Sequence, residues 1–303
     1  MSADDNHILE QIQLISDQLM SAYEYQSVSF YYPYCYEIQS GSGGLIRFYG
    51  AEHFRDPENY QFEAICSMIR LGRPELVLVE HHQELHRSAS EATSSNFLSE
   101  VALLQPAEAV SHSESRLAVC LAAEVGAQVE CPEPTYEEQW RFLYARGYSI
   151  QQIAAYYLTR AAAMAPFWAG LMTPPQVMEY RIGQLRATWP WEKEFLSPAF
   201  VNSFLSEHYE FDIFSASPEL LSRLVLPVKP ETDIDFCVLN AVGASVMNFI
   251  DSKIVLRIGE LSKQYANILV IFGATHMVRQ EKALRSLLRA NATALPEHGI
   301  VGS

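Results

Sequence analysis

The sequence predicts an α/β protein with a mixed, mostly parallel central sheet flanked by helices. Short, continuously apolar segments alternate with longer segments of helical periodicity, a pattern typical of parallel strands buried between helices. Two of the apolar segments, LIRFY at 45–49 and NILVIF at 267–272, are each followed by a GAxH tetrapeptide and then by a helical segment. A long aromatic-rich segment, 136–225, has helical periodicity and no convincing strand, which indicates a helical insertion in the middle of the chain.

Length and composition favour one globular unit. A chain of 303 residues with 49% hydrophobic residues can bury a sizeable core, and we predict a single α/β domain over 1–303 in which 136–225 covers the strand ends. The net charge of −15, from 36 acidic and 21 basic residues, argues against nucleic acid or an anionic membrane as a partner. The most apolar helical segment, 152–172, contains Arg160 and Pro166, which are unfavourable in a membrane span.

The N-terminus and the cysteines bear on the compartment and on the type of metal site. The first residues, MSADDNHILEQIQ, contain no basic region followed by an apolar core, so no secretory signal is predicted and a cytoplasmic location is expected. Five widely spaced cysteines without a CxxC pair favour neither a disulfide framework nor a thiolate zinc site.

Helix and strand signals place the other elements. Asp56 is expected to cap a helix that has Pro57 at its first position and ends at Gly72. A later serine-capped helix has Glu114 in its first turn and Gly126 at its end. The elements are predicted in this order: helix 7–25, extended segment 27–38, strand 45–49, helix 56–71, strand 75–80, a helix and a short strand within 111–134, helices within 136–225, helix 238–265, strand 267–272 and helix 278–291.

The two GAxH motifs predict a site at one edge of the sheet. In an open α/β sheet, ligands bind at the carboxyl ends of the parallel strands, where a glycine permits a tight turn and the next side chains project into the crevice. His53 and His276 would both project there. Glu80 ends the second strand and Glu133 ends the third, so four titratable groups are expected to converge.

These residue types support two kinds of hydrolytic chemistry. Neutral imidazoles and carboxylates are ligands for Zn, Mn, Co or Fe, and a metal with an open position can generate a hydroxide nucleophile near neutral pH. The same groups without a metal could act as a general base and its orienting carboxylate. A histidine at a strand end is also often only a hydrogen-bonded structural residue, but the pairing of two such histidines with Glu80 favours a site.

Other polar residues have simpler explanations. Glu52 could pair with His53 or face the solvent, and exposure is the favoured interpretation because charged residues are mostly exposed. Capping explains Glu114, whereas Glu133 lies between two prolines and has no structural need for a charge. The cluster EHHQELH lacks the HExxH order of zinc proteases, so it is interpreted as a polar loop that contains His81, His82 and His86.

With these residues identified, the chain resembles the TraB/TIKI (PrgY-like) family, within the wider group that includes ChaN-like and erythromycin-esterase-like proteins. The resemblance rests on FYGAEHFRDPENY, on ELVLVE and on ILVIFGATHMVRQEKALRSLL, in this order and at similar spacing. It covers about 45–135 and 245–291. The resemblance implies a metal-dependent hydrolase whose catalytic and metal-binding residues are His53, His276 and Glu80.

One departure from the family pattern concerns an arginine. The family commonly has an Arg-Asp pair at the start of the helix before the last strand, but this chain has Ile250 followed by Asp251. A cation for the site would have to come from elsewhere, and Lys253, Arg257 and Arg47 are candidates. A member of the family without catalytic activity is therefore an alternative.

The leading hypothesis is a hydrolase that acts on a peptide or small-molecule amide or ester. His53, His276 and Glu80 would form its site, with Glu133, Glu52 and Asp251 as secondary members. One alternative is a non-catalytic protein that binds a peptide, haem or a metal, and another is an interaction protein that docks a partner through the aromatic helices of 136–225.

Overall fold

The structure is a computed structural model, and it confirms the predicted α/β fold class. The described residues are 3–25, 27–53, 58–80, 104–106, 109, 113–168, 172–210, 212–226 and 237–293.

The sheet has five strands in the order β1-β2-β5-β3-β4. The strand β1 pairs antiparallel with β2, and the remaining neighbours are parallel to each other. The turn SGSGG connects β1 to β2, and Gly43 adopts a φ of 85° there. The strands are β1 (Tyr34–Gln39), β2 (Leu45–Ala51), β3 (Leu76–Val79), β4 (Gln128–Glu130) and β5 (Asn267–Gly273).

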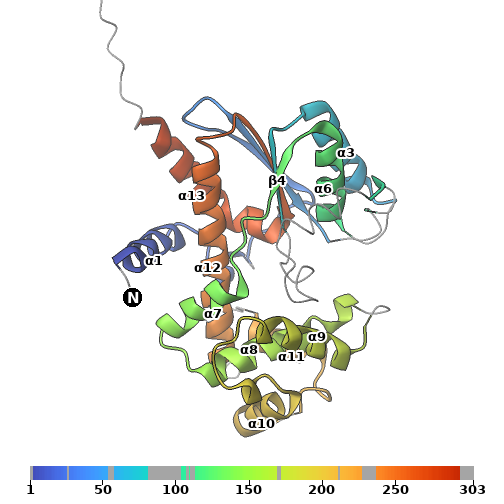
Figure 1. Ribbon diagram of the computed structural model, residues 1–303, viewed down its shortest axis with the longest axis vertical. Helices are drawn as coiled ribbons and strands as arrows, with labels where there is room; N and C mark the ends of the chain where they lie inside the picture. Colours follow the sequence, from blue (N-terminus) through green and yellow to red (C-terminus); the bar gives the residue numbers. More distant parts are fainter. Residues whose placement is uncertain are drawn as a thin grey trace, which may run out of the picture.

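Helices pack on both faces of the sheet (Figure 1). Side chains alternate between the faces along each strand, so Leu269 contacts one cluster of buried residues while its neighbour Val270 contacts the other. The helices α3 (Tyr60–Gly72) and α6 (Glu114–Val125) cover the first face. The helices α12 (Val238–Leu261) and α13 (Ala274–Thr293) cover the second.

A group of helices follows β4. In Figure 1 the chain leaves the carboxyl end of β4 and runs through the connecting segment 131–135 into α7, so this group lies on the side toward which the parallel strands point. Among the described residues of 136–225 there is no strand. The helices are α7 (Tyr136–Ala145), α8 (Ile150–Ala163), α9 (Pro174–Arg186), α10 (Pro198–Tyr209) and α11 (Pro218–Val225), with 3-10 turns at Ala165–Trp168 and Lys193–Phe195.

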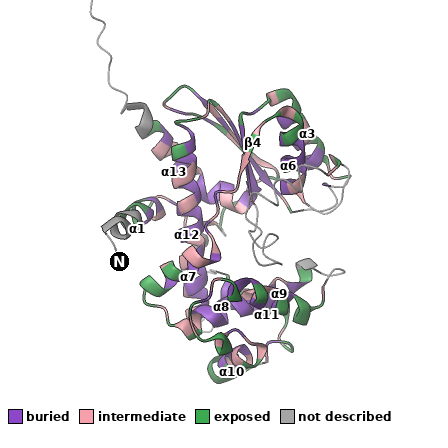
Figure 2. Ribbon diagram, viewed as in Figure 1, coloured by how far each residue is buried: buried purple, intermediate pink, exposed green. Residues whose placement is uncertain are grey.

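The helix α12 joins this group to the sheet. Buried residues continue from the sheet through α12 into α8 (Figure 2), and they form one cluster of hydrophobic side chains. The N-terminal helices α1 (Ala3–Ser16) and α2 (Ala22–Tyr25) pack against α12 and α13 respectively. Within the described part of the chain, no helix combines the length and the apolar character that a membrane crossing requires.

Several helix boundaries differ from the prediction. The single helix predicted over 7–25 is wrong, because α1 ends at Ser16 and α2 begins only at Ala22. The helix α3 begins at Tyr60 with Asn59 as its N-cap, and the expected start at Asp56 and Pro57 lies outside the described residues. Its left-handed terminal residue is Arg73, with a φ of 41°, rather than Gly72. The helix α13 begins at Ala274, four residues earlier than expected, because the strand β5 passes into the helix without a connecting loop.

Candidate functional site

The carboxyl ends of the parallel strands bring four titratable side chains to one edge of the sheet. His53 follows β2 by two residues, and Glu80 comes directly after β3. His276 lies in the first turn of α13, immediately after β5, and Glu133 lies three residues beyond the end of β4. Because β2, β5, β3 and β4 are parallel neighbours, their carboxyl ends lie at a common edge.

Glu80 occupies the centre of this group. Its Oε1 atom lies 3.9 Å from Nε2 of His53 and 3.9 Å from Nε2 of His276. Its Oε2 atom accepts a hydrogen bond from the backbone N–H of Gly273, and its carbonyl oxygen accepts one from the hydroxyl of Ser115. Only 9% of the Glu80 side chain is exposed, so both ends of this residue are held in place.

A buried carboxylate orients His276. Its Nδ1 atom lies 2.6 Å from Oδ1 of Asp251 on α12, and an ionised carboxylate can only accept, so Nδ1 carries the proton. Burial alone would lower the pKa of His276, but Asp251 and then Glu80 outweigh it and raise the pKa to about 9. Burial would also raise the pKa of Asp251, but the charges of Arg279 and His276 hold it below its ordinary value.

A second carboxylate orients His53. Its Nδ1 atom lies 2.5 Å from Oε1 of Glu114, in the first turn of α6. This hydrogen bond, together with the charges of Glu80 and Glu114, raises the pKa of His53 to about 9 against the effect of desolvation. The His53 side chain is 56% exposed, whereas His276 is 18% exposed, so His53 is the imidazole that a substrate can reach more easily.

The role expected for Glu114 was therefore incomplete. Ser113 caps α6 by accepting from the backbone N–H of Arg116, so the helix end is satisfied without the Glu114 side chain. That side chain is buried and contacts His53 instead. A carboxylate next to a serine cap has the sequence signature of capping, and no local signal separates the two roles.

Each glycine of the two GAxH motifs allows atoms of the other motif to approach its Cα closely. A Cβ atom on Gly273 would lie 2.7 Å from Nε2 of His53 and 3.0 Å from Oε2 of Glu80. A Cβ atom on Gly50 would lie 2.9 Å from Cα of Ala274 and 2.9 Å from the carbonyl oxygen of Tyr34. The absence of a side chain at Gly273 thus leaves space for the side chains of His53 and Glu80, whereas its absence at Gly50 leaves space for the backbone at the start of α13.

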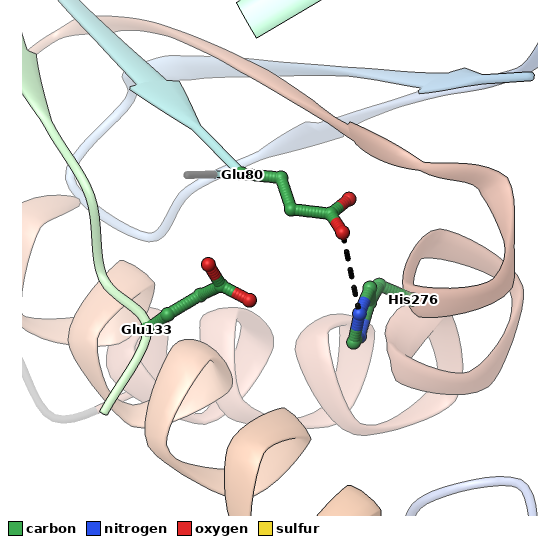
Figure 3. A group of neighbouring side chains, drawn as sticks. All are labelled: Glu80, Glu133 and His276. Atoms are coloured by element: carbon green, nitrogen blue, oxygen red, sulfur yellow. Dashed lines mark ion pairs between the residues drawn. The ribbon is translucent and has the colours of Figure 1, made fainter. Parts of the chain in front are cut away.

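Three of the side chains could hold a metal ion. Glu80, Glu133 and His276 each offer one ligand atom, and these atoms lie within 4.8 Å of one another (Figure 3). Ligand atoms at about 2.0–2.2 Å from one ion lie within about 4.4 Å of each other. Small side-chain rotations would therefore bring these three ligand atoms within bonding distance of one ion. Because Asp251 accepts the hydrogen bond from Nδ1 of His276, Nε2 is the atom left to bind a metal. This is the usual carboxylate–histidine–metal arrangement.

This group differs from the set that the sequence predicted. The expected ligands were His53, His276 and Glu80, but Glu133 takes the place of His53 in the group. The hydrogen bond to Glu114 draws the His53 ring toward α6, although its Nε2 atom remains near Glu80. Glu133, which was expected to be a secondary member, is therefore a candidate ligand.

The other predicted residues lie around the site or elsewhere. Asp251 contacts His276 directly. The main chain of Glu52 forms two hydrogen bonds with the side chain of Gln61: its N–H donates to Oε1, and its carbonyl oxygen accepts from Nε2. The three candidate cations pair with other carboxylates: Lys253 with Glu138, Arg257 with Glu130 and Glu260, and Arg47 with Glu37. The histidines His81, His82 and His86 lie outside the described residues.

A cation is nevertheless present beside Asp251. Nη1 of Arg279 lies 2.5 Å from Oδ2 of Asp251, and neither side chain is exposed. Arg279 was not among the residues predicted from the sequence, although its position three residues after His276 places both side chains on one face of a helix.

Comparison with models of known protein families finds no match to this chain, and comparison with curated protein sequences finds none either.

Proposed function

We propose that the protein is a metal-dependent hydrolase of amide or ester bonds, as its resemblance to the TraB/TIKI family implies. The observation that supports this proposal most directly is the position of Glu80 between two imidazoles. Each imidazole is oriented at Nδ1 by a separate buried carboxylate, Glu114 or Asp251. Convergence of oriented histidines and carboxylates at the carboxyl edge of a parallel sheet is typical of an active site.

Glu80, Glu133 and His276 would hold a divalent ion such as Zn, Mn, Co or Fe. When bound, such an ion would polarise the substrate carbonyl, acidify water and, through its charge, favour the neutral form of His53. His276 must lose its Nε2 proton to act as a ligand, while its Nδ1–H remains bound to Asp251.

His53 is the candidate proton carrier. Its imidazole would take a proton at Nε2 from the attacking water as the water oxygen bonds to the carbonyl carbon. It would then return this proton to the leaving nitrogen or oxygen as the bond to the carbonyl carbon breaks. Glu114 stabilises the imidazolium between these two steps, because its carboxylate accepts from Nδ1. The net reaction consumes one water and yields an acid and an amine or alcohol.

Turnover of amide and ester substrates tests this proposal. Wild-type protein incubated with Mn, Co or Zn chloride would be screened against fluorogenic peptides and p-nitrophenyl esters beside His53→Ala. We expect hydrolysis by the wild type and a loss of roughly a hundredfold or more in His53→Ala, the usual range for a general acid–base group. The variant Arg285→Met is a suitable control, because Arg285 pairs with Glu281 on the same helix as His276.

A fully metallated wild type with no turnover would contradict the hydrolase and favour a binding protein. Equal turnover by the folded His53→Ala variant would exclude His53 as the proton carrier.

A further inference from the structure

We propose that Arg279 is a positioning residue that fixes Asp251 and, through Asp251, the imidazole of His276. The inference rests on the proposed function only in treating His276 as a site residue. Arg279 is among the largest fully buried side chains of the described structure. A guanidinium without exposed surface is costly unless it is paired, so its partners indicate what it holds in place.

Arg279 has three anchors at its side chain. Nη1 lies 2.5 Å from Oδ2 of Asp251, an ion pair that lacks the alignment of a hydrogen bond. Nη2 donates to Oδ1 of Asn248 at 2.6 Å, and Nε donates to the carbonyl oxygen of Met20 at 3.2 Å. The planar guanidinium is thus fixed in orientation by its two hydrogen bonds while its charge faces Asp251.

The two oxygens of Asp251 have separate partners. Oδ2 faces Arg279, whereas Oδ1 accepts from Nδ1 of His276 at 2.6 Å and from Nε2 of Gln280 at 2.7 Å. Rotation of the carboxylate would separate Oδ2 from the guanidinium in the buried interior. Arg279 therefore keeps Oδ1 directed at His276, and this contact orients the imidazole so that Nε2 faces Glu80.

The residues of this hydrogen-bonded group come from two helices, and on each helix they are spaced three or four positions apart. Asn248 and Asp251 lie on one face of α12, and His276, Arg279 and Gln280 lie on one face of α13. The buried cation comes from α13, whereas the family that the chain resembles has its arginine on the helix before the last strand, at the position of Ile250 on α12. Contact between the two helices thus provides the charge that the sequence lacks at 250.

The N-terminal segment adds support on both sides of His276. The backbone N–H of Met20 donates to the carbonyl oxygen of Arg279 at 3.0 Å, in addition to the bond that Met20 receives. The hydroxyl of Tyr25 lies 3.0 Å from the hydroxyl of Thr275, next to His276. The first turns of α13 are therefore anchored by a segment that lies 250 to 259 residues earlier in the chain.

The solvent exchange rate of the His276 Nδ1–H proton tests this role without requiring activity. It would be measured by proton NMR on the full-length, metal-free protein, with the signal assigned by its loss in His276→Ala. In folded Arg279→Met we expect exchange to be roughly tenfold faster or more, because a weakened hydrogen bond to a charged group opens more often. Arg285→Met should retain the wild-type rate, because Arg285 pairs with Glu281 instead.

Asn248→Ala provides a second variant if Arg279→Met does not fold. Asn248 is half-buried, and its replacement removes the acceptor of the Arg279 Nη2–H hydrogen bond while both charges stay in place. We therefore expect a smaller increase in the exchange rate of the His276 Nδ1–H proton. A wild-type exchange rate in folded Arg279→Met, or in Asn248→Ala where Arg279→Met is unfolded, would overturn the proposal. The absence of a protected signal in the wild type would also overturn it.

Zinc titration by calorimetry separates this proposal from the proposed function. We expect Zn²⁺ to bind Arg279→Met roughly ten times more weakly than the wild type, since loss of an outer partner usually costs 10- to 100-fold in metal affinity. A wild type that binds no Zn²⁺, Mn²⁺ or Co²⁺ and hydrolyses no substrate would refute the proposed function. The exchange rates would still decide the role of Arg279.

Discussion

Glu80 and His276 come from different strand ends, and Oε1 of Glu80 lies 3.9 Å from Nε2 of His276. The same oxygen lies at the same distance from Nε2 of His53, so one carboxylate faces both imidazoles. The backbone N–H of Gly273 binds the other oxygen of Glu80, which prevents free rotation of the carboxylate. This arrangement makes the two GAxH motifs parts of one site.

Replacement of Glu114 by glutamine should lower the pKa of His53 from about 9 toward its ordinary value of about 6.5. The carboxylate favours the imidazolium, and an amide of the same shape removes that charge. An NMR titration of the ring protons would measure the change. His208 serves as an internal control, since its Nδ1 contacts the carbonyl oxygen of Phe204 on α10. An unchanged His53 titration would show that Glu114 does not set its charge.

The stability of the metal-free protein should fall at alkaline pH. The folded-state pKa of His276 is raised to about 9 from about 6.5 in the unfolded chain, so folding is favoured by proton binding. This contribution to the free energy of unfolding is fully present below about pH 6.5 and is lost as the pH rises through about 9. Its upper size is about 3 kcal/mol, from 1.36 kcal/mol per pKa unit.

Urea unfolding in EDTA between pH 6 and 10 would measure this loss. Asp251→Asn removes the main charge that raises the pKa of His276, so the folded variant should show a flatter pH profile. A wild-type slope in Asp251→Asn would contradict the assignment to this pair.

The two motif glycines should respond differently to alanine. In Gly273→Ala the added methyl group would meet His53 and Glu80, whose side chains can move, so metal affinity and turnover should fall more than stability. In Gly50→Ala it would meet the backbone of Ala274 and Tyr34, so we expect destabilisation of about 1–3 kcal/mol.

Urea unfolding and metal titration of both variants would make the comparison. Gly183→Ala is a suitable control, because nothing lies within 4 Å of a Cβ atom at that position. Equal stability losses in Gly50→Ala and Gly273→Ala would contradict the distinction between backbone and side-chain contacts.

The strand ends of the site could be predicted from sequence because they follow a topological rule. The apolar segments before His53, Glu80 and His276 have the pattern of buried parallel strands, and parallel strands bring their carboxyl ends to one edge. The rule requires only the order of the elements along the chain. It therefore applies even where helix ends are misplaced, as at the start of α13.

The partners of these residues could not be predicted, since they depend on contacts distant in sequence. Glu114 lies 61 residues from His53, and Asp251 lies 25 residues before His276. The sequence signal at Glu114 was that of a helix cap, and the packing of α6 beside β3 decided its role. Arg279 carried a weak signal as the i+3 neighbour of His276, but its burial against α12 depended on the tertiary contact.

Whether His53 or Glu133 belongs to the candidate metal-binding group depends on side-chain direction. Glu133 lies in the segment after β4, and its carboxylate faces Glu80 and His276 (Figure 3). The ring of His53 turns toward Glu114. Sequence spacing places residues at the edge of the sheet but does not determine these orientations.

Metal binding by Glu133→Gln directly tests the proposal that Glu80, Glu133 and His276 hold a divalent ion. Wild-type protein, Glu133→Gln and Glu130→Gln would each be titrated calorimetrically with Zn, Mn and Co chloride. Glu130 is a matched control, since it lies three residues earlier and pairs with Arg257. We predict one ion per wild-type chain, the same affinity in Glu130→Gln, and a loss of roughly a hundredfold in affinity in folded Glu133→Gln. Wild-type affinity in Glu133→Gln, or no binding by the wild type, would contradict it.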